Sequence, residues 1–287
     1  MGGTKIEGIA LAENGKELFR KRIDTPRNDY NGTVEAITGI VDELERKTNQ
    51  KGTVGIGIPG AISPQTGLVK NANSTCLIGR AFDKDLAKAL KRPVSLSNDA
   101  NCFAVSEATD GAGAGATLVF GVILGTGVGG CLAINGKAIK GINGITGEWG
   151  HNPLPWATNE ERPGPQCYCG LNGCIETFLS GPGLTADYKR ESNQVCDAHD
   201  LVKLESPAAK AALSRYENRL ARALASVINV LDPDIIVLGG GLSNIHQLYE
   251  SVPYLWDKWV FSDRVDTQLL KNLHGASSGV RGAAWLD

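Results

Sequence analysis

The fold is decided by the stretch Thr117-Leu-Val-Phe-Gly-Val-Ile-Leu-Gly-Thr-Gly-Val-Gly-Gly-Cys-Leu-Ala-Ile-Asn-Gly-Lys137. Its first part, Thr117 to Leu124, is a continuous apolar run that predicts a buried strand. The loop that follows, Gly125 to Gly130, has the G-x-G-x-x-G spacing of dinucleotide-binding proteins. That fingerprint opens a helix, whereas Cys131 to Ile134 continues as a second strand, so we reject it. A Gly-rich loop between two strands remains, and such a loop can bind phosphate through backbone N–H groups.

Strand and helix patterns alternate on both sides of this stretch, which predicts an α/β protein. Residues 6–12 and 17–23 read as two strands joined by the turn Glu13 to Lys16. Further strand patterns cover 53–58, 94–97, 131–139 in two pieces around Asn135-Gly136, and 234–238. Helical periodicity covers 32–48, 100–109, 206–231, 244–259 and 279–286.

The chain of 287 residues is long enough for two domains. Gly111-Ala-Gly-Ala-Gly-Ala116 has no side chains to pack, which suits a hinge between domains. We therefore expect a smaller N-terminal α/β domain over 1–113 and a larger C-terminal α/β domain over 114–287. The last helix is expected to pack back on the first domain.

The amino-acid composition limits the kinds of molecule that this protein is expected to bind. The charges nearly balance, with 29 Lys and Arg against 31 Asp and Glu, so no electrostatic excess favours nucleic acid or a membrane surface. No apolar run approaches the roughly 18 residues of a membrane span, and the N-terminus lacks a signal-peptide pattern. We expect a cytoplasmic protein whose partner is a small molecule.

Four metal-ligand residues lie close together in the sequence: His151, Cys167, Cys169 and Cys174. Three thiols and an imidazole suit tetrahedral Zn²⁺, and a shell filled by protein ligands indicates a structural ion. Free buried cysteines beside an unrelated histidine are the alternative. The scattered cysteines Cys76, Cys102, Cys131 and Cys196 are expected to be small buried side chains.

Asp99 stands between the strand pattern 94–97 and the helix pattern 100–109. It could simply cap the helix. Alternatively, a strand-end carboxylate could remove the proton from a hydroxyl that attacks ATP·Mg²⁺. Glu148 and Glu176 flank the cysteine cluster and, with His151, form a polar set suited to binding sugar hydroxyls.

Taken in order, several motifs resemble the ROK family of sugar kinases and repressors across nearly the whole chain. The segments are Gly2-Gly-Thr-Lys5, Gly57-Ile-Pro-Gly60, Asn98-Asp-Ala-Asn101, Gly125-Thr-Gly-Val-Gly129, Gly147-Glu-Trp-Gly-His151, Cys167-Tyr-Cys-Gly-Leu-Asn-Gly-Cys-Ile-Glu176 and Gly239-Gly-Gly241. The resemblance implies an actin-like fold of two RNase H-like α/β domains with a zinc knuckle, and usually a homodimer.

The resemblance also implies roles for individual residues. Asp99 would be the catalytic base. The sugar would contact Asn98, Glu148, His151, Glu176 and Gly60. ATP, with its Mg²⁺, would contact Gly2, Gly3, Thr4, Lys5, Gly125, Thr126, Gly127, Gly239 and Gly240. The zinc would be held by His151, Cys167, Cys169 and Cys174.

Within the family, three segments look most like bacterial fructokinases that also accept mannose: 70–75, 82–86 and 151–156. We therefore expect ATP-dependent phosphorylation of fructose. N-acetylglucosamine kinase is the alternative, because it shares the pattern around Asn98 and Glu148. A repressor would need an N-terminal helix-turn-helix, for which we see no room, and an inactive sugar-binding relative would not need Asp99.

The sequence departs from the family pattern at one place. The family motif begins with a strand carrying Asp before Gly-Gly-Thr-Lys, whereas Met1 and Gly2 stand at the start here. We expect the natural protein to have residues before Met1, and the intact mass of the native protein tests that expectation.

Overall fold

The computed structural model describes residues 1–72 and 74–286; Asn73, which lies in the segment 70–75 used above, is outside the described residues. The chain forms two compact units. The first contains Met1–Gly115, Ala133–Thr146 and the residues from Ala276 onward, and the second contains Ala116–Leu132 and Gly147–Gly275. Each unit has a hydrophobic core of its own.

The strands of the first unit form separate short pairs. The chain opens on the antiparallel hairpin of β1 (Lys5–Leu11) and β2 (Glu17–Asp24), as its sequence predicts. Strand β3 (Gly55–Ile58) lies parallel to β6 (Ser95–Asn98). Smaller pieces are β4 (Ala61–Ile62), antiparallel to β5 (Val69–Lys70), and β9 (Lys137–Ala138), antiparallel to residues 133–134.

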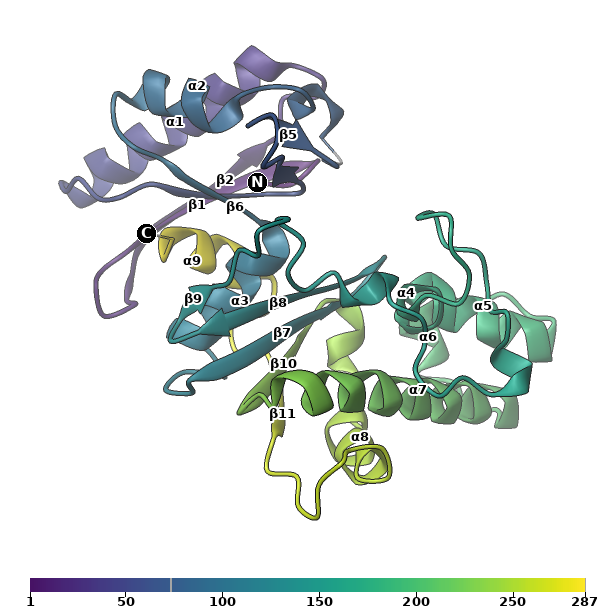
Figure 1. The fold of residues 1–287 in the computed structure, drawn as a ribbon. Coiled ribbons are helices and arrows are strands. Elements are labelled where there is room, and N and C mark those ends of the chain that lie inside the picture. Colours follow the sequence, from purple (N-terminus) through teal and green to yellow (C-terminus); the bar gives the residue numbers. More distant parts are fainter. Residues whose placement is uncertain (73, 287) are drawn as a thin grey trace. The chain divides into compact units, whose positions relative to one another are not determined.

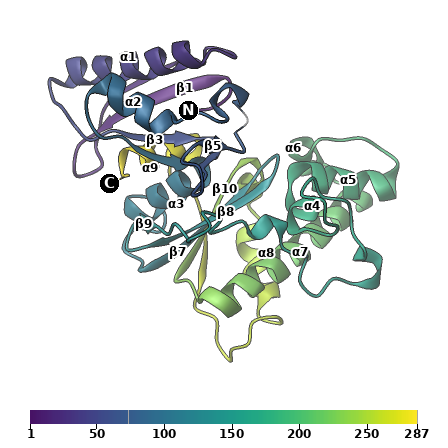
Figure 2. The same cartoon turned by 45° about the horizontal axis from the view of Figure 1, so that its top comes forward.

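Helices cover both faces of these strands. On one side lie α1 (Tyr30–Thr48) and α2 (Phe82–Leu90), and on the other α3 (Asp99–Thr109) and α9 (Ser278–Ala284) (Figures 1 and 2). Helix α1 begins where the Asp29 side chain accepts a hydrogen bond from the Gly32 N–H, and it ends at Asn49 in the left-handed conformation. Helices α1 and α2 bury the apolar side chains of β1 and β3 in one core.

A cavity of about 480 Å³ separates the two main strand pairs of the first unit. It is lined by residues of β1, β3, α1 and α9, among them Ile6, Ile37, Ile40, Ile56, Val280 and Ala283. Within the described residues β1 pairs only with β2, and β3 only with β6. The other edge of each strand therefore carries backbone groups with no partner strand.

A five-stranded sheet has the order β11-β10-β7-β8-β9, of which the second unit contains β11, β10, β7 and residues 128–132 of β8. Strand β10 (Ile235–Gly239) runs parallel to both β7 (Leu118–Leu124) and β11 (Gln268–Lys271). Strand β8 (Val128–Ile134) follows β7 through the Gly-rich loop, so this loop joins two strands, as its sequence predicts. The long apolar runs of β7 and β10 match their burial in the middle of the sheet.

Helices α7 (Pro207–Leu231) and α8 (Leu248–Trp256) pack against each other in the second unit, and three shorter helices gather near α7 (Figure 1). These are α4 (Ile175–Leu179), α5 (Gly181–Ser192) and α6 (Ala198–Leu201). Helix α7 starts at Pro207, after the capping side chain of Ser206, and ends at Asp232 in the left-handed conformation. Its apolar face forms much of the core of the unit.

Candidate active site

In the first unit, Asn98 and Asp99 stand at the junction of β6 and α3. The Asn98 Oδ1 atom accepts a hydrogen bond of 2.7 Å from the Asn101 N–H, so Asn98 is the N-cap of α3. Asp99 is the first residue of the helix and does not cap it. The capping alternative for Asp99 is therefore wrong, and its carboxylate is available for another role.

The environment of Asp99 favours a stronger base. Its side chain reaches solvent, but desolvation by the surrounding protein raises the pKa of the carboxyl above its usual value. A hydrogen bond of 2.9 Å from the Ala100 N–H to Oδ1 opposes part of that rise. A carboxylate with a raised pKa accepts a proton more readily from an attacking hydroxyl.

The other predicted ligand residues of the first unit lie in turns. The Gly2 N–H donates to the Lys5 carbonyl at 2.8 Å, which closes a tight turn through Gly3 and Thr4. Lys5 Nζ forms an exposed ion pair with Asp24. Gly60 follows β3, and a Cβ atom on it would lie 2.9 Å from the Ala72 Cβ atom, so a side chain has no room there.

In the second unit, the Gly-rich loop and the Gly239-Gly240 turn meet at one end of the sheet. The Gly125 carbonyl accepts a hydrogen bond of 2.8 Å from the Gly181 N–H, which fixes the loop to the start of α5. Gly240 has a φ of 81°, and a Cβ atom there would lie 2.3 Å from the Leu124 carbonyl oxygen. Glycine is thus required where the turn passes the end of β7. Exposed Thr126 lies in this loop. Backbone groups at the carboxyl ends of parallel strands are a common phosphate-binding arrangement.

Glu176 lies directly beside this loop. Its Oε2 atom accepts a hydrogen bond of 2.8 Å from the Val128 N–H. A Cβ atom on Gly127 would lie 2.6 Å from the same oxygen, which explains the glycine at that position. Exposed Glu148 directly precedes the short helical turn Trp149–His151, and half-buried His151 is the last residue of that turn. The structure thus places Glu176 against the Gly-rich loop that sequence reasoning assigned to phosphate.

The four predicted metal ligands converge in the second unit, with one donor atom from each of His151, Cys167, Cys169 and Cys174 within 4.8 Å of the others. The Sγ atoms of Cys169 and Cys174 are 3.7 Å apart, and His151 Nδ1 is 3.5 Å from Cys167 Sγ. Zn–S bonds of about 2.3 Å and Zn–N bonds of about 2.0 Å in a tetrahedron require separations of roughly 3.5–3.8 Å. The donor set and its spacing therefore fit a tetrahedral zinc ion.

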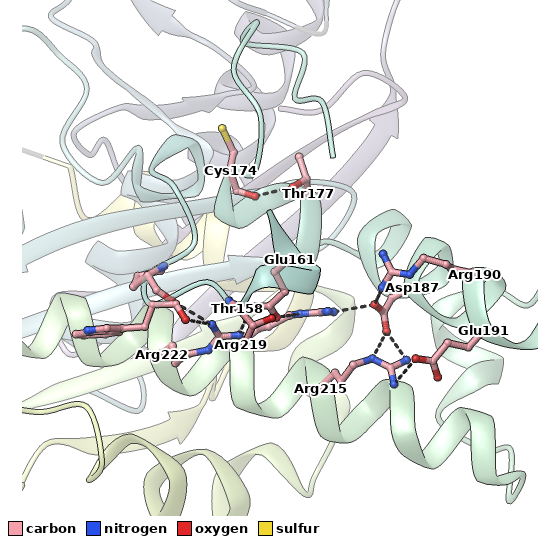
Figure 3. Close-up of polar contacts among 12 residues, drawn as sticks. Thr158, Glu161, Cys174, Thr177, Asp187, Arg190, Glu191, Arg215, Arg219 and Arg222 are labelled. Atoms are coloured by element: carbon pink, nitrogen blue, oxygen red, sulfur yellow. Dashed lines mark hydrogen bonds and ion pairs between the residues drawn. The ribbon is translucent and has the colours of Figure 1, made fainter. Parts of the chain in front are cut away.

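A buried network of ion pairs supports the segment that leads into this cluster, and sequence reasoning missed it. Arg219 and Arg222, 4% and 3% exposed, extend from α7 to Glu161 at 2.8 Å each (Figure 3). Arg219 also reaches Asp187 of α5 at 3.0 Å. Charged residues spaced along a helix usually face solvent, so only the tertiary structure reveals that these are buried.

Comparison with known proteins identifies the family. The ROK family model matches residues 1–287. The chain is 39% identical over 294 residues to the N-acetyl-D-glucosamine kinase of Photobacterium profundum, covering 100% of this chain and 97% of the relative. Its fold is similar to the ROK hexokinase of Thermus thermophilus, with a TM-score of 0.88 and 28% identity over 99% of this chain and 94% of that one. It is also similar to a ROK glucokinase of Streptomyces griseus in complex with glucose and AMPPNP, with a TM-score of 0.77, 26% identity and coverage of 99% and 96%.

The two α/β units and the residues gathered in them are those of an actin-like sugar kinase. The chain belongs to the ROK family, and the prediction of a ROK family sugar kinase is confirmed. The finer prediction of a fructokinase is not supported, because the curated relatives are named N-acetyl-D-glucosamine kinase. Segments 70–75, 82–86 and 151–156 therefore do not identify the sugar. Among the described residues, no helix has both the length and the apolar character needed to cross a membrane.

Proposed function

We propose that this protein is an N-acetylglucosamine kinase that transfers the terminal phosphate of ATP to a hydroxyl of the sugar. The observation that carries the proposal is the full-length similarity, at 39% identity, to an enzyme of that name. This was the alternative to fructokinase in the sequence analysis. Whether the enzyme prefers a sugar with a hydroxyl group or one with an acetamido group depends on the shape of the sugar pocket. The spacing of residues in the sequence does not determine that shape.

In the proposed reaction Asp99 accepts the proton of the attacking hydroxyl. Its position at the start of α3 and its raised pKa support this role. Asn98 caps the helix through Oδ1, which leaves its amide N–H groups for the sugar. Phosphoryl transfer needs little covalent chemistry beyond positioning and charge stabilisation.

The second unit would bind the phosphates and the sugar. The N–H groups of the loop Gly125–Gly127 are proposed to bind the phosphates, which carry Mg²⁺ with them, and the Gly239-Gly240 turn is proposed to contact adenosine. Glu148, His151 and Glu176 are proposed to bind sugar hydroxyls, because carboxylates accept and an imidazole N–H donates. In the first unit, the turn Gly2–Lys5 is proposed to contact phosphate and Gly60 the sugar.

ATP-dependent ADP release with N-acetylglucosamine, glucose, mannose and fructose tests the proposal. We expect the highest kcat/KM with N-acetylglucosamine. Asp99→Asn should lower kcat by about 10²- to 10⁴-fold, because general base catalysis contributes about that much. Asp42→Asn, an exposed carboxylate of α1, is the matched control and should keep full activity. A higher kcat/KM with fructose would show that fructose, and not N-acetylglucosamine, is the preferred substrate. No turnover with any of the four sugars would refute the proposed kinase activity.

We also propose that His151, Cys167, Cys169 and Cys174 hold a structural zinc ion. A closed shell of one nitrogen and three sulfur ligands leaves no position for a reactive water, so the ion would fix the His151 ring in place. Cys169→Ser should lower bound zinc from about one ion per chain to well below one, and should weaken sugar binding. Half-buried Cys196 lies outside the cluster, and Cys196→Ser should keep both properties. Sugar affinity unchanged in metal-free protein would contradict the link between the two sites.

A further inference from the structure

Tyr168 lies between two of the candidate metal ligands in the sequence, Cys167 and Cys169, and its side chain contacts a third, His151. Tyr168 is 83% exposed. Its hydroxyl is 2.9 Å from His151 Nε2, and the two rings meet edge to face with centroids 5.0 Å apart. The family resemblance assigned no role to this position, so its contact with His151 requires an explanation.

The two nitrogens of the His151 ring face different partners. Nδ1 lies 3.5 Å from Cys167 Sγ, on the side of the ligand cluster. A ring whose Nδ1 binds a metal carries its proton on Nε2. With a metal ion on Nδ1, the Nε2–H group would be the donor and the Tyr168 oxygen, 2.9 Å away, its acceptor.

A sugar hydroxyl would use the same donor. A phenol and an alcohol each accept one hydrogen bond and can donate another, so one can replace the other at Nε2–H.

We propose that Tyr168 is a specificity-determining residue whose hydroxyl occupies the sugar position on His151 Nε2 and is displaced when the sugar binds. The exposed ring can swing into solvent without disturbing the core. A ligand must then supply a hydroxyl that matches the phenol it replaces, which selects polyhydroxyl ligands over apolar ones. This inference rests on the proposed function, because it takes His151 as a sugar contact.

The test is Tyr168→Phe, which keeps the aromatic ring beside His151 and removes only the hydroxyl. Displacing one hydrogen bond costs about 0.5–1.5 kcal/mol, so removing it should tighten binding of N-acetylglucosamine by about 2- to 12-fold. The dissociation constant is measured by calorimetry on the zinc-loaded protein without nucleotide. KM should fall with little change in kcat. Tyr254→Phe, 75% exposed on α8, is the matched control and should behave as wild type.

A purely structural role for Tyr168 gives a different result. If the phenol only orients His151 toward the metal, Tyr168→Phe should weaken zinc affinity by about 10- to 100-fold, the usual effect of losing such a partner. Competition with a chelator measures that affinity, and we expect it to be unchanged. Weaker zinc binding, or sugar binding that is unchanged or weaker in the variant, overturns the inference.

Nuclear magnetic resonance tests the hydrogen bond itself, because the chain has only four histidines. Without sugar, exchange of the His151 Nε2 proton with solvent should be slower in the wild type than in Tyr168→Phe. Equal exchange overturns the inference before any sugar is added. A wild-type protein that binds none of the sugars refutes the proposed function and this inference together, whereas wild-type binding with no gain in the variant refutes this inference alone.

Discussion

The two units of the molecule have similar layers of helix and strand but are stabilised in different ways. In the first unit, strands β1 and β3 lie on opposite sides of a cavity of about 480 Å³ and share no ladder in the described part of the chain. In the second, β10 is paired on both edges and a buried network of arginines and carboxylates joins two helices to the segment before the cysteine cluster. Buried ion pairs thus support the segment before the candidate metal site, whereas β1 and β3 in the unit that carries Asp99 each keep one edge without a partner strand.

The largest expected effect concerns the buried ion pairs of the second unit. Arg219→Met should lower the free energy of unfolding by about 3 kcal/mol, because it leaves two buried carboxylates short of a partner while Arg222 and Arg215 still neutralise part of their charge. Arg190 also pairs with Asp187 but is 58% exposed, so Arg190→Met should cost less than about 1 kcal/mol.

Denaturant unfolding followed by tryptophan fluorescence measures both variants. Four of the five tryptophans, at 149, 156, 256 and 259, belong to the second unit, so the signal reports mainly on that unit. Equal losses in the two variants would show that burial of the network does not stabilise this unit.

The pH dependence of stability gives a second test of the network. Burial alone would raise the pKa of Glu161, but hydrogen bonds from Arg222 and then Arg219 lower it from 4.5 to about 2. Because the folded-state pKa is depressed, the stabilisation is complete above about pH 4.5 and is lost as the pH falls toward 2. Lowering the pKa of Glu161 from 4.5 to about 2 corresponds to about 3 kcal/mol of folding free energy.

Glu161→Gln removes this titration. The difference in unfolding free energy between wild type and variant should be constant above about pH 5 and should shrink between pH 4.5 and pH 2. A difference that does not change over that interval would contradict the assigned pKa.

The smallest expected effect compares the backbones of the two units. Amides of β3 should exchange hydrogen at least about tenfold faster than those of β10, a difference of about 1.4 kcal/mol, because one edge of β3 faces the cavity. Hydrogen exchange read by mass spectrometry on peptides covering 55–58 and 235–239 measures it. Equal protection of the β3 and β10 amides from exchange would mean that the unpaired edge of β3 does not lower its local stability.

Much of this architecture could be predicted because it depends on local pattern. The hairpin of β1 and β2, helices α1, α3 and α7, and strands β7 and β10 were all expected near their observed positions. Periodicity and turn chemistry are encoded within a few neighbouring residues. Helix α2, helices α4 to α6 and strand β11 were missed, because these segments are short or carry no clear apolar period.

The candidate site shows the same division. The sequence by itself determined the kinds of chemistry available: a ligand set of one histidine and three cysteines, a carboxylate at a strand end, and Gly-rich loops. Only the tertiary structure decided that Asn98 and not Asp99 caps α3, that Glu176 lies against the Gly-rich loop, and that Tyr168 bonds His151 Nε2. It also decided that residues 133–146 belong to the first unit, and that α7 buries two arginines. The physical reason is that residue types and spacings are local properties, whereas partners, burial and pKa depend on residues that are distant in the chain.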